Sequence, residues 1–242
     1  MTKLIHISDL HMHDFRFSGN MVKATKELVE KIIEQEDPAE CVVIISGDLV
    51  SSMTGREKIS ALYALLPLRN AGFRILIAKG NHDHGPLGLI LKSSAVDHFR
   101  DLVKKVCGHL PDEWPQHIEL DDMMIVTMNS SWDQTVLARG RLGVDQIKEA
   151  QRLFDRVPDK LHVATFHHCP SSGDPTKRLS DRMKLKEHLE CDLMLVGHLH
   201  QDREWSNTFG AKLLMSVAPS ARENKYRKIW FNENGGVEWV WG

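Results

Sequence analysis

Five short polar motifs are spread along the sequence, and their residue types are those that bind metal ions. In chain order the motifs are Asp9-Leu10-His11, Gly47-Asp48, Gly80-Asn81-His82-Asp83, His167-His168-Cys169-Pro170 and Gly197-His198-Leu199-His200. Each motif alone is a weak signal, because a lone Gly-Asp is usually a turn. Together they mix carboxylate and amide oxygens with imidazole nitrogens, a donor set that suits Mn, Fe or Zn better than Mg or Ca. The set therefore predicts a transition-metal site.

The first three motifs each follow a short apolar run that is typical of a buried strand. These runs are Lys3–Ser8, Cys41–Ser46 and Arg74–Ala78, and amphipathic helices are predicted between them over about 21–35 and 57–71. Alternating strands and helices indicate a parallel sheet with right-handed crossovers. In such sheets ligands gather at the carboxyl ends of the strands, which is where these motifs stand.

The rest of the chain reads as a mixture of strands and helices within the same domain, 1–242. Residues 118–120 and 123–128 predict an antiparallel hairpin around Asp121-Asp122. Helices are predicted over about 96–106, 144–156 and 182–190, and strands over 161–166, 193–196, 211–216, 228–231 and 237–241. The segment at about 85–115 is expected to form a cap beside the site. We find no repeat and no linker.

The composition is that of an ordinary globular protein of 242 residues, with 42% hydrophobic residues and a formal net charge of −2. This charge argues against a global attraction to nucleic acid or an anionic membrane. No apolar run is long enough to span a bilayer, and the start of the chain does not resemble a signal peptide. We therefore expect a cytoplasmic protein with reduced cysteines. Nothing in the sequence specifies an oligomeric state.

The order of the five motifs resembles the signature of the calcineurin-like metallophosphoesterases, and the likeness extends from residue 9 to residue 200. The resemblance implies an α/β fold, a four-layer αββα sandwich of two mixed sheets flanked by helices, with the metals at strand carboxyl ends. It implies two transition-metal ions, Mn and/or Fe, or Zn. One ion would be held by Asp9, His11 and His200, the other by Asn81, His168 and His198, with Asp48 bridging the two.

Two assignments within this resemblance need comment. Adjacent residues of a strand point to opposite sides, so only one of His167 and His168 can face the site. Many relatives show His-x-Pro, which favours His168, whereas relatives with His-His-Pro use the first histidine and keep His167 as the alternative. His82 is implied to be the catalytic residue, standing near the leaving oxygen. Relatives often pair it with a carboxylate at the position of Ser51, so its orienting partner is left open.

The resemblance implies hydrolysis of a phosphoester by a hydroxide held on the two metals. The segment Gly140–Phe154 resembles the small bacterial cyclic-nucleotide phosphodiesterases, so we predict a small phosphodiester, such as a cyclic nucleotide, as substrate. A phosphomonoesterase and a nuclease of the same fold are the alternatives, although the near-neutral charge disfavours nucleic acid. A non-catalytic interaction scaffold is the alternative of another class. It is disfavoured because every motif position is filled.

Overall fold

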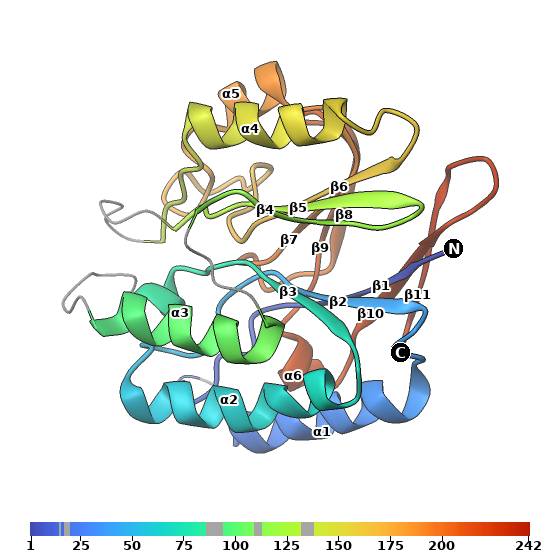
Figure 1. Cartoon of the computed structure of the whole chain (residues 1–242). Helices are drawn as coiled ribbons and strands as arrows, with labels where there is room; N and C mark the ends of the chain where they lie inside the picture. The colour runs from blue at the N-terminus through green and yellow to red at the C-terminus, as the bar shows by residue number, and fades with distance from the viewer. Residues whose placement is uncertain (15, 17–19, 86–93, 109–112, 132–137) are drawn as a thin grey trace.

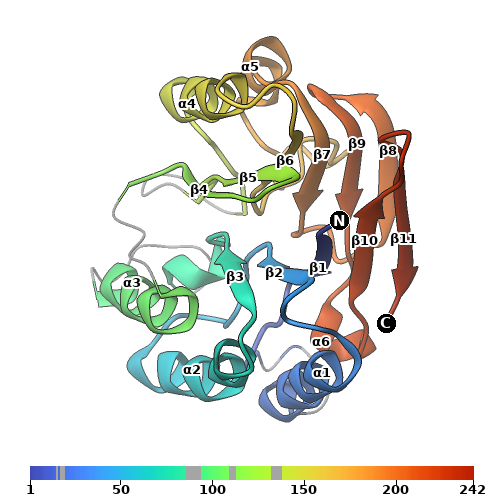
Figure 2. The same cartoon turned by 45° about the vertical axis from the view of Figure 1, so that its right-hand side comes forward.

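The computed structural model of the chain describes residues 1–14, 16, 20–85, 94–108, 113–131 and 138–242. The predicted cap at 85–115 lies partly outside these residues. Two mixed sheets pack face to face, and helices cover their outer sides (Figures 1 and 2), with α1–α3 against the first sheet and α4 and α5 against the second. The predicted four-layer sandwich is confirmed. No helix among the described residues is long and apolar enough to cross a membrane.

The first sheet has the order β11-β10-β1-β2-β3. Its parallel strands are β1 (Lys3–Ile7), β2 (Cys41–Ile45) and β3 (Arg74–Ile77), joined by α1 (Met21–Gln35) and α2 (Gly55–Asn70). In register, Ile7 of β1 lies beside Ile45 of β2, which lies beside Ile77 of β3. The three strands therefore end at the same level, and the three motifs that follow them emerge together. The antiparallel strands β10 (Arg227–Phe231) and β11 (Val237–Trp241) complete the sheet.

The second sheet has the order β4-β5-β6-β7-β9-β8. Strands β5, β6, β7 and β9 are parallel, and β4 and β8 pair antiparallel at the two edges. The strands and helices that belong to this layer are β4 (Gln116–Glu119), β5 (Met123–Thr127), α4 (Val144–Asp155), β6 (Leu161–Thr165), α5 (Arg182–His188), β7 (Cys191–Val196), β8 (Arg203–Thr208) and β9 (Ala211–Ser216). The predicted hairpin at Asp121-Asp122 is confirmed. Helix α3 (Ser94–Cys107) returns to the first sheet, and α6 (Ser220–Glu223) precedes β10.

The apolar core lies in three layers, which explains the continuous apolar runs of the central strands. Alternate residues of β1 and β2, such as Leu4 and Val42, face the second sheet and meet Ile125 and Val163. Their neighbours Ile5 and Val43 face the helices on the other side. A strand that is covered on both faces carries apolar residues at every position. The fold thereby fixes the strand ends rigidly.

His6 on β1 is a buried histidine of this core and gives a stability prediction. Its Nε2 atom lies 2.9 Å from the Ser46 hydroxyl, and burial, with the nearby charge of Arg227, lowers its pKa from 6.5 to about 3. The unfolded chain therefore binds a proton at His6 that the folded chain excludes. Its contribution to stability is complete above pH ~6.5 and is lost as the pH falls toward 3, by up to ~1.4 kcal/mol per pH unit.

We expect His6→Gln to flatten this part of the pH dependence while the amide keeps a bond to Ser46. The measurement is the free energy of unfolding in urea from pH 7.5 to pH 4.5, in the presence of a chelator. The variant His117→Gln, on the edge strand β4, is the matched control. Parallel pH curves for wild type and His6→Gln would contradict the prediction.

Candidate metal centre

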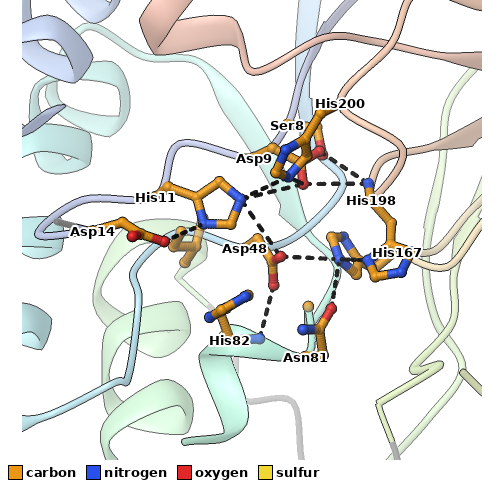
Figure 3. Close-up of polar contacts among 12 residues, drawn as sticks. Ser8, Asp9, His11, Asp14, Asp48, Asn81, His82, His167, His198 and His200 are labelled. Atoms are coloured by element: carbon orange, nitrogen blue, oxygen red, sulfur yellow. Dashed lines mark hydrogen bonds and ion pairs between the residues drawn. The ribbon is translucent and has the colours of Figure 1, made fainter. Parts of the chain in front are cut away.

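The loops that follow β1, β2, β3, β6 and β7 bring the predicted site residues together (Figure 3). Asp9, His11, Asp48, Asn81 and His167 are almost fully buried there, and His198 and His200 approach from the last loop. Such crowding of polar groups requires unusual backbone. Positive φ angles, from 45° to 71°, occur at Asp9, His11, Asp48, His198 and His200. Non-glycine residues rarely adopt this conformation, and strained positions of this kind cluster at functional sites.

Two glycines allow the loops to approach one another this closely. A Cβ atom on Gly80 would lie 2.2 Å from both the backbone nitrogen and a carboxylate oxygen of Asp48. A Cβ atom on Gly197 would lie 2.0 Å from the Ser8 hydroxyl and 2.6 Å from the Asp9 carboxylate. Any larger side chain at either position would push the carboxylates out of place. The glycines of the motifs therefore serve close packing as well as the turn itself.

Three donors form a first group beside the end of β1. Nε2 of His11 lies 2.9 Å from Nε2 of His200, and the latter lies 3.2 Å from the Asp9 carboxylate. Donors bound to one metal at about 2.1 Å are themselves separated by roughly 3 Å, which these distances match. The backbone N–H of His198 also donates to the Asp9 carboxylate, at 3.0 Å. The first group therefore fits a metal ion.

A second group forms around His167. Its Nε2 atom lies 3.1 Å from the Asn81 side-chain oxygen, 3.2 Å from Nδ1 of His198 and 3.2 Å from the Asp48 carboxylate. Its Nδ1–H donates to the Ser46 carbonyl at 2.8 Å, which directs Nε2 at this group. Metal-binding histidines are commonly oriented in this way by a bond from their second ring nitrogen. The second group also fits a metal ion.

Asp48 stands between the two groups. The same carboxylate oxygen lies 3.2 Å from Nε2 of His167 and 3.8 Å from Nε2 of His11, while the other oxygen accepts the His82 backbone N–H at 2.9 Å. Burial alone would raise the pKa of Asp48, but His167, His82 and His11 together hold that pKa far below its usual range. The carboxylate is therefore ionised at neutral pH. Its position between the groups is the one that a bridging ligand would need.

His168, the predicted ligand, lies next to His167 and His198, and one ring nitrogen of each of the three lies within 4.8 Å of the other two. Its Nδ1 atom lies 2.9 Å from the Ser130 hydroxyl, and its ring packs against Gly140 and the ring of His198. His167 and His168 lie in the bend after β6, with nearly perpendicular rings that both pack against the ring of His198 but form hydrogen bonds with different partners. His167, which the sequence analysis kept as the alternative, is the histidine of this pair that contacts Asp48 and Asn81.

His82 lies at the edge of the centre, with its ring 5.1 Å from the ring of His11. Its Nδ1–H donates to the backbone carbonyl of Ser51 at 3.0 Å, so Ser51 replaces the carboxylate of relatives through its main chain. Asp83 instead accepts backbone N–H groups of Leu49, Val50 and Gly80 and so ties two of the motif loops together. His82 is thereby oriented with Nε2 turned away from Ser51.

Asp14 and Arg16 extend the site, and the sequence motifs did not indicate either residue. An oxygen of Asp14 lies 3.6 Å from Nδ1 of His11 and also accepts from Arg16. Arg16 donates in turn to Nε2 of His82 at 3.2 Å. The only sequence signal was their position in the loop that follows Asp9-x-His11, because neither closes a strand.

Several other predictions can be placed. His13 bonds to Ser60 at an exposed position, and His84 is buried beside Lys79, so neither lines the cavity described below. Cys169 is buried in the core of the second sheet.

A cavity of about 330 Å³ opens above the two groups of donors. Its lining includes Asp48, Asn81, His82, His198 and His200, together with the cationic residues Arg16, Lys177 and Arg203. This volume lies within the range of small-molecule sites. A ligand in the cavity would contact both groups of donors and several cationic side chains at once.

Comparison with known proteins identifies the family. The sequence model of the calcineurin-like phosphoesterases matches residues 2–202. The chain belongs to this family. By that membership it is a metal-dependent phosphoester hydrolase. A search of curated proteins finds no match.

Among solved structures, a dimetal phosphatase from Danio rerio superposes with a TM-score of 0.68 at 12% identity, covering 99% of this chain and 98% of that one. A putative 5'-nucleotidase from Staphylococcus aureus gives 0.56 at 14% identity, and NAD nucleotidase from Haemophilus influenzae gives 0.56 at 12%. Both matches cover 99% of this chain, but only 52% and 49% of those longer proteins. At these identities the likeness is one of fold.

Proposed function

We propose that this phosphoesterase hydrolyses a small phosphoester at a two-metal centre. One ion would be held by Asp9, His11 and His200, and the other by Asn81, His167 and His198, with Asp48 shared. The observation that supports this proposal is the convergence of donor atoms from five strand ends onto two groups at ligand-to-ligand distances. We propose His167 in place of His168 because His167 is the histidine that contacts both Asp48 and Asn81.

Bound metal ions would supply a water that ionises near neutral pH and positive charge beside the phosphate oxygens. The protein's own residues hold the remaining parts of the reaction. Asp9 and Asp48 provide the negative charge that offsets two adjacent cations. The Ser46 carbonyl keeps His167 in the tautomer that can bind metal. His82 faces the cavity through Nε2, and in its imidazolium form, with Nε2–H released from the contact with Arg16, it can protonate the leaving oxygen. Mn or Fe suits this donor set, with Zn as a third choice.

The sequence predicts a small phosphodiester such as a cyclic nucleotide, and the cavity volume suits a molecule of nucleotide size, whether diester or monoester. Arg16 places a cation beside His82 that the sequence motifs did not indicate, and this cation favours a phosphomonoester over the predicted diester. The structural neighbours include a dimetal phosphatase and nucleotidases. We propose a cytoplasmic setting, as the sequence analysis predicted.

The experiment that tests the function is a substrate panel with the full chain loaded with manganese, iron or zinc. We expect two metal equivalents per chain and turnover of small phosphoesters, measured on cyclic nucleotides, nucleoside monophosphates, aryl esters and short DNA. Binding of two metals without hydrolysis of any substrate would favour the interaction scaffold. Hydrolysis of DNA alone would favour the nuclease.

The choice between the adjacent histidines gives a separate prediction. His167→Ala should lower the bound metal from two equivalents to about one, because it removes the donor that faces Asn81 and Asp48. His168→Ala is the matched control and should keep both metals, with a loss of thermal stability because its buried ring fills a space beside Gly140. The measurement is elemental analysis of the purified variants after dialysis. Loss of metal from His168→Ala alone would restore the choice that the sequence favoured.

A further inference from the structure

Arg16 is a cation that is fixed beside the metal centre without being part of it. Its Nε lies 2.9 Å and 3.0 Å from the two carboxylate oxygens of Asp14, and its Nη2 contacts the same carboxylate. Asp14 is itself buried and is close to Nδ1 of His11. One carboxylate therefore holds both a predicted metal ligand and the arginine. A bidentate pair of this kind fixes the guanidinium plane as well as its position.

The guanidinium still has donors to offer to a ligand. Of its five N–H groups, Nε and one from Nη2 face Asp14, and a second from Nη2 reaches Nε2 of His82 at 3.2 Å. Within the described part of the chain, Nη1 has no hydrogen-bond partner. The side chain is 47% exposed and lines the same cavity as Asp48, Asn81 and His200. Hydrogen bonding to Asp14 raises the pKa of Arg16, and the charge of Asp48 adds to this, so the cation is permanent.

The two candidate substrates differ in what they would present to this cation. A phosphomonoester is close to a dianion above pH ~6 and carries three non-bridging oxygens. A phosphodiester is a monoanion with two, because an ester group takes the place of the third. A guanidinium gains more from a charged oxygen than from an ester oxygen, since hydrogen bonds between ionised groups are shorter and stronger. A diester gains little at this position.

We infer that Arg16 binds the charged oxygen that a phosphomonoester has and a phosphodiester lacks, and that it thereby selects phosphomonoesters. This inference rests on the proposed two-metal hydrolysis and names its substrate class. Asp14 acts through Arg16 as a positioning residue. His82 accepts from the same guanidinium, so Arg16 would contact both the phosphate and His82.

The test compares two esters with the same leaving group, p-nitrophenyl phosphate and methyl p-nitrophenyl phosphate, on the manganese-loaded full chain. We expect wild type to prefer the monoester in kcat/KM. Arg16→Ala should lower kcat/KM for the monoester by about 10–100-fold, the usual size of a lost charged hydrogen bond, and change the diester by less than about threefold. Arg16→Lys should restore part of the monoester activity, because lysine keeps the positive charge but lacks the planar pair of N–H donors of the guanidinium.

Two further measurements separate binding from folding. In calorimetric titrations, inorganic phosphate should bind Arg16→Ala about 10–100-fold more weakly than it binds wild type. The variant should keep both metals. Arg152→Ala, which removes an exposed arginine paired with Glu149 on α4, is the matched control and should leave both rates unchanged. Equal loss on both esters, unchanged phosphate binding, or a wild-type preference for the diester would overturn the inference. Failure of wild type to hydrolyse either ester would instead refute the proposed function.

Discussion

Asp48→Asn is expected to remove nearly all phosphoesterase activity, by on the order of 10³-fold or more. The reason is electrostatic, because a neutral amide cannot offset the repulsion between two adjacent dications. Removal of a single neutral stabilising donor already costs about 10²–10³ in kcat, and Asp48 carries a full charge. The variant should also bind metal more weakly, with the second equivalent lost first. Turnover on an aryl phosphate and elemental analysis of the same sample measure both effects.

The Asp48→Asn experiment has a matched control in Asp155→Asn, at an exposed position on α4. This change removes the same charge far from the cavity and should leave activity and metal content unaltered. A circular dichroism spectrum should show that Asp48→Asn folds, since the amide can still accept the backbone N–H of His82. Near-normal turnover by Asp48→Asn with both metals retained would show that Asp48 does not bridge them.

Most of the elements could be predicted from the sequence because the central strands are buried on both faces. Residues such as Val42, Val43 and Ile44 form runs without polar interruption, and the structure places all of them in strands. The sequence did not predict strand β8, because this strand is not buried on both faces. It lies at the edge of its sheet and is largely exposed, so Arg203, Glu204 and Ser206 give it no apolar alternation. An edge strand of this kind is specified by pairing with β9 rather than by its own sequence.

Pro67 shows a second limit of local sequence signals. Its position favours a bend or an end of the helix, yet α2 continues through it to Asn70. Pro67 lies on the exposed side of α2, and the nearby residues Leu65 and Leu68 are buried in the core. Water can satisfy the carbonyl that loses its helical partner there, and apolar burial outweighs the remaining cost. Tertiary packing thus overrides the local preference.

Within the site, the sequence indicated the residues that close strands and could not indicate those held by a loop. Arg16 contacts His82, which lies far along the chain, and Asp14 acts through Arg16 and His11. The pairing of His82 with the Ser51 carbonyl has no sequence signal at all, because any residue offers a backbone carbonyl. The same applies to His167, whose orientation is fixed by the carbonyl of Ser46. Main-chain partners of this kind become visible only in the folded protein.

The other large effect is expected for His82→Ala, which should keep both metals and lose roughly 10²–10⁴ in rate, the range for a positioned proton donor. The expectation rests on geometry, because the Ser51 carbonyl holds Nδ1 and leaves Nε2 facing the cavity beside Arg16. Loss of the proton donor should matter most for poor leaving groups. An alkyl or ribose ester should therefore lose more activity than a nitrophenyl ester, whose leaving oxygen needs little protonation.

The comparison between leaving groups separates three roles that His82 could have. His82 also lies within ligand distance of His11 and Asp48, so metal analysis of His82→Ala is the first readout. Loss of metal would make His82 a ligand and refute the proton-donor assignment. Equal loss on both ester types, with metals retained, would indicate that His82 binds phosphate together with Arg16.

Arg16→Ala should show no such dependence on the leaving group, because a permanent guanidinium does not release a proton in this pH range. The difference between the two variants therefore assigns the proton to His82 and the charge to Arg16.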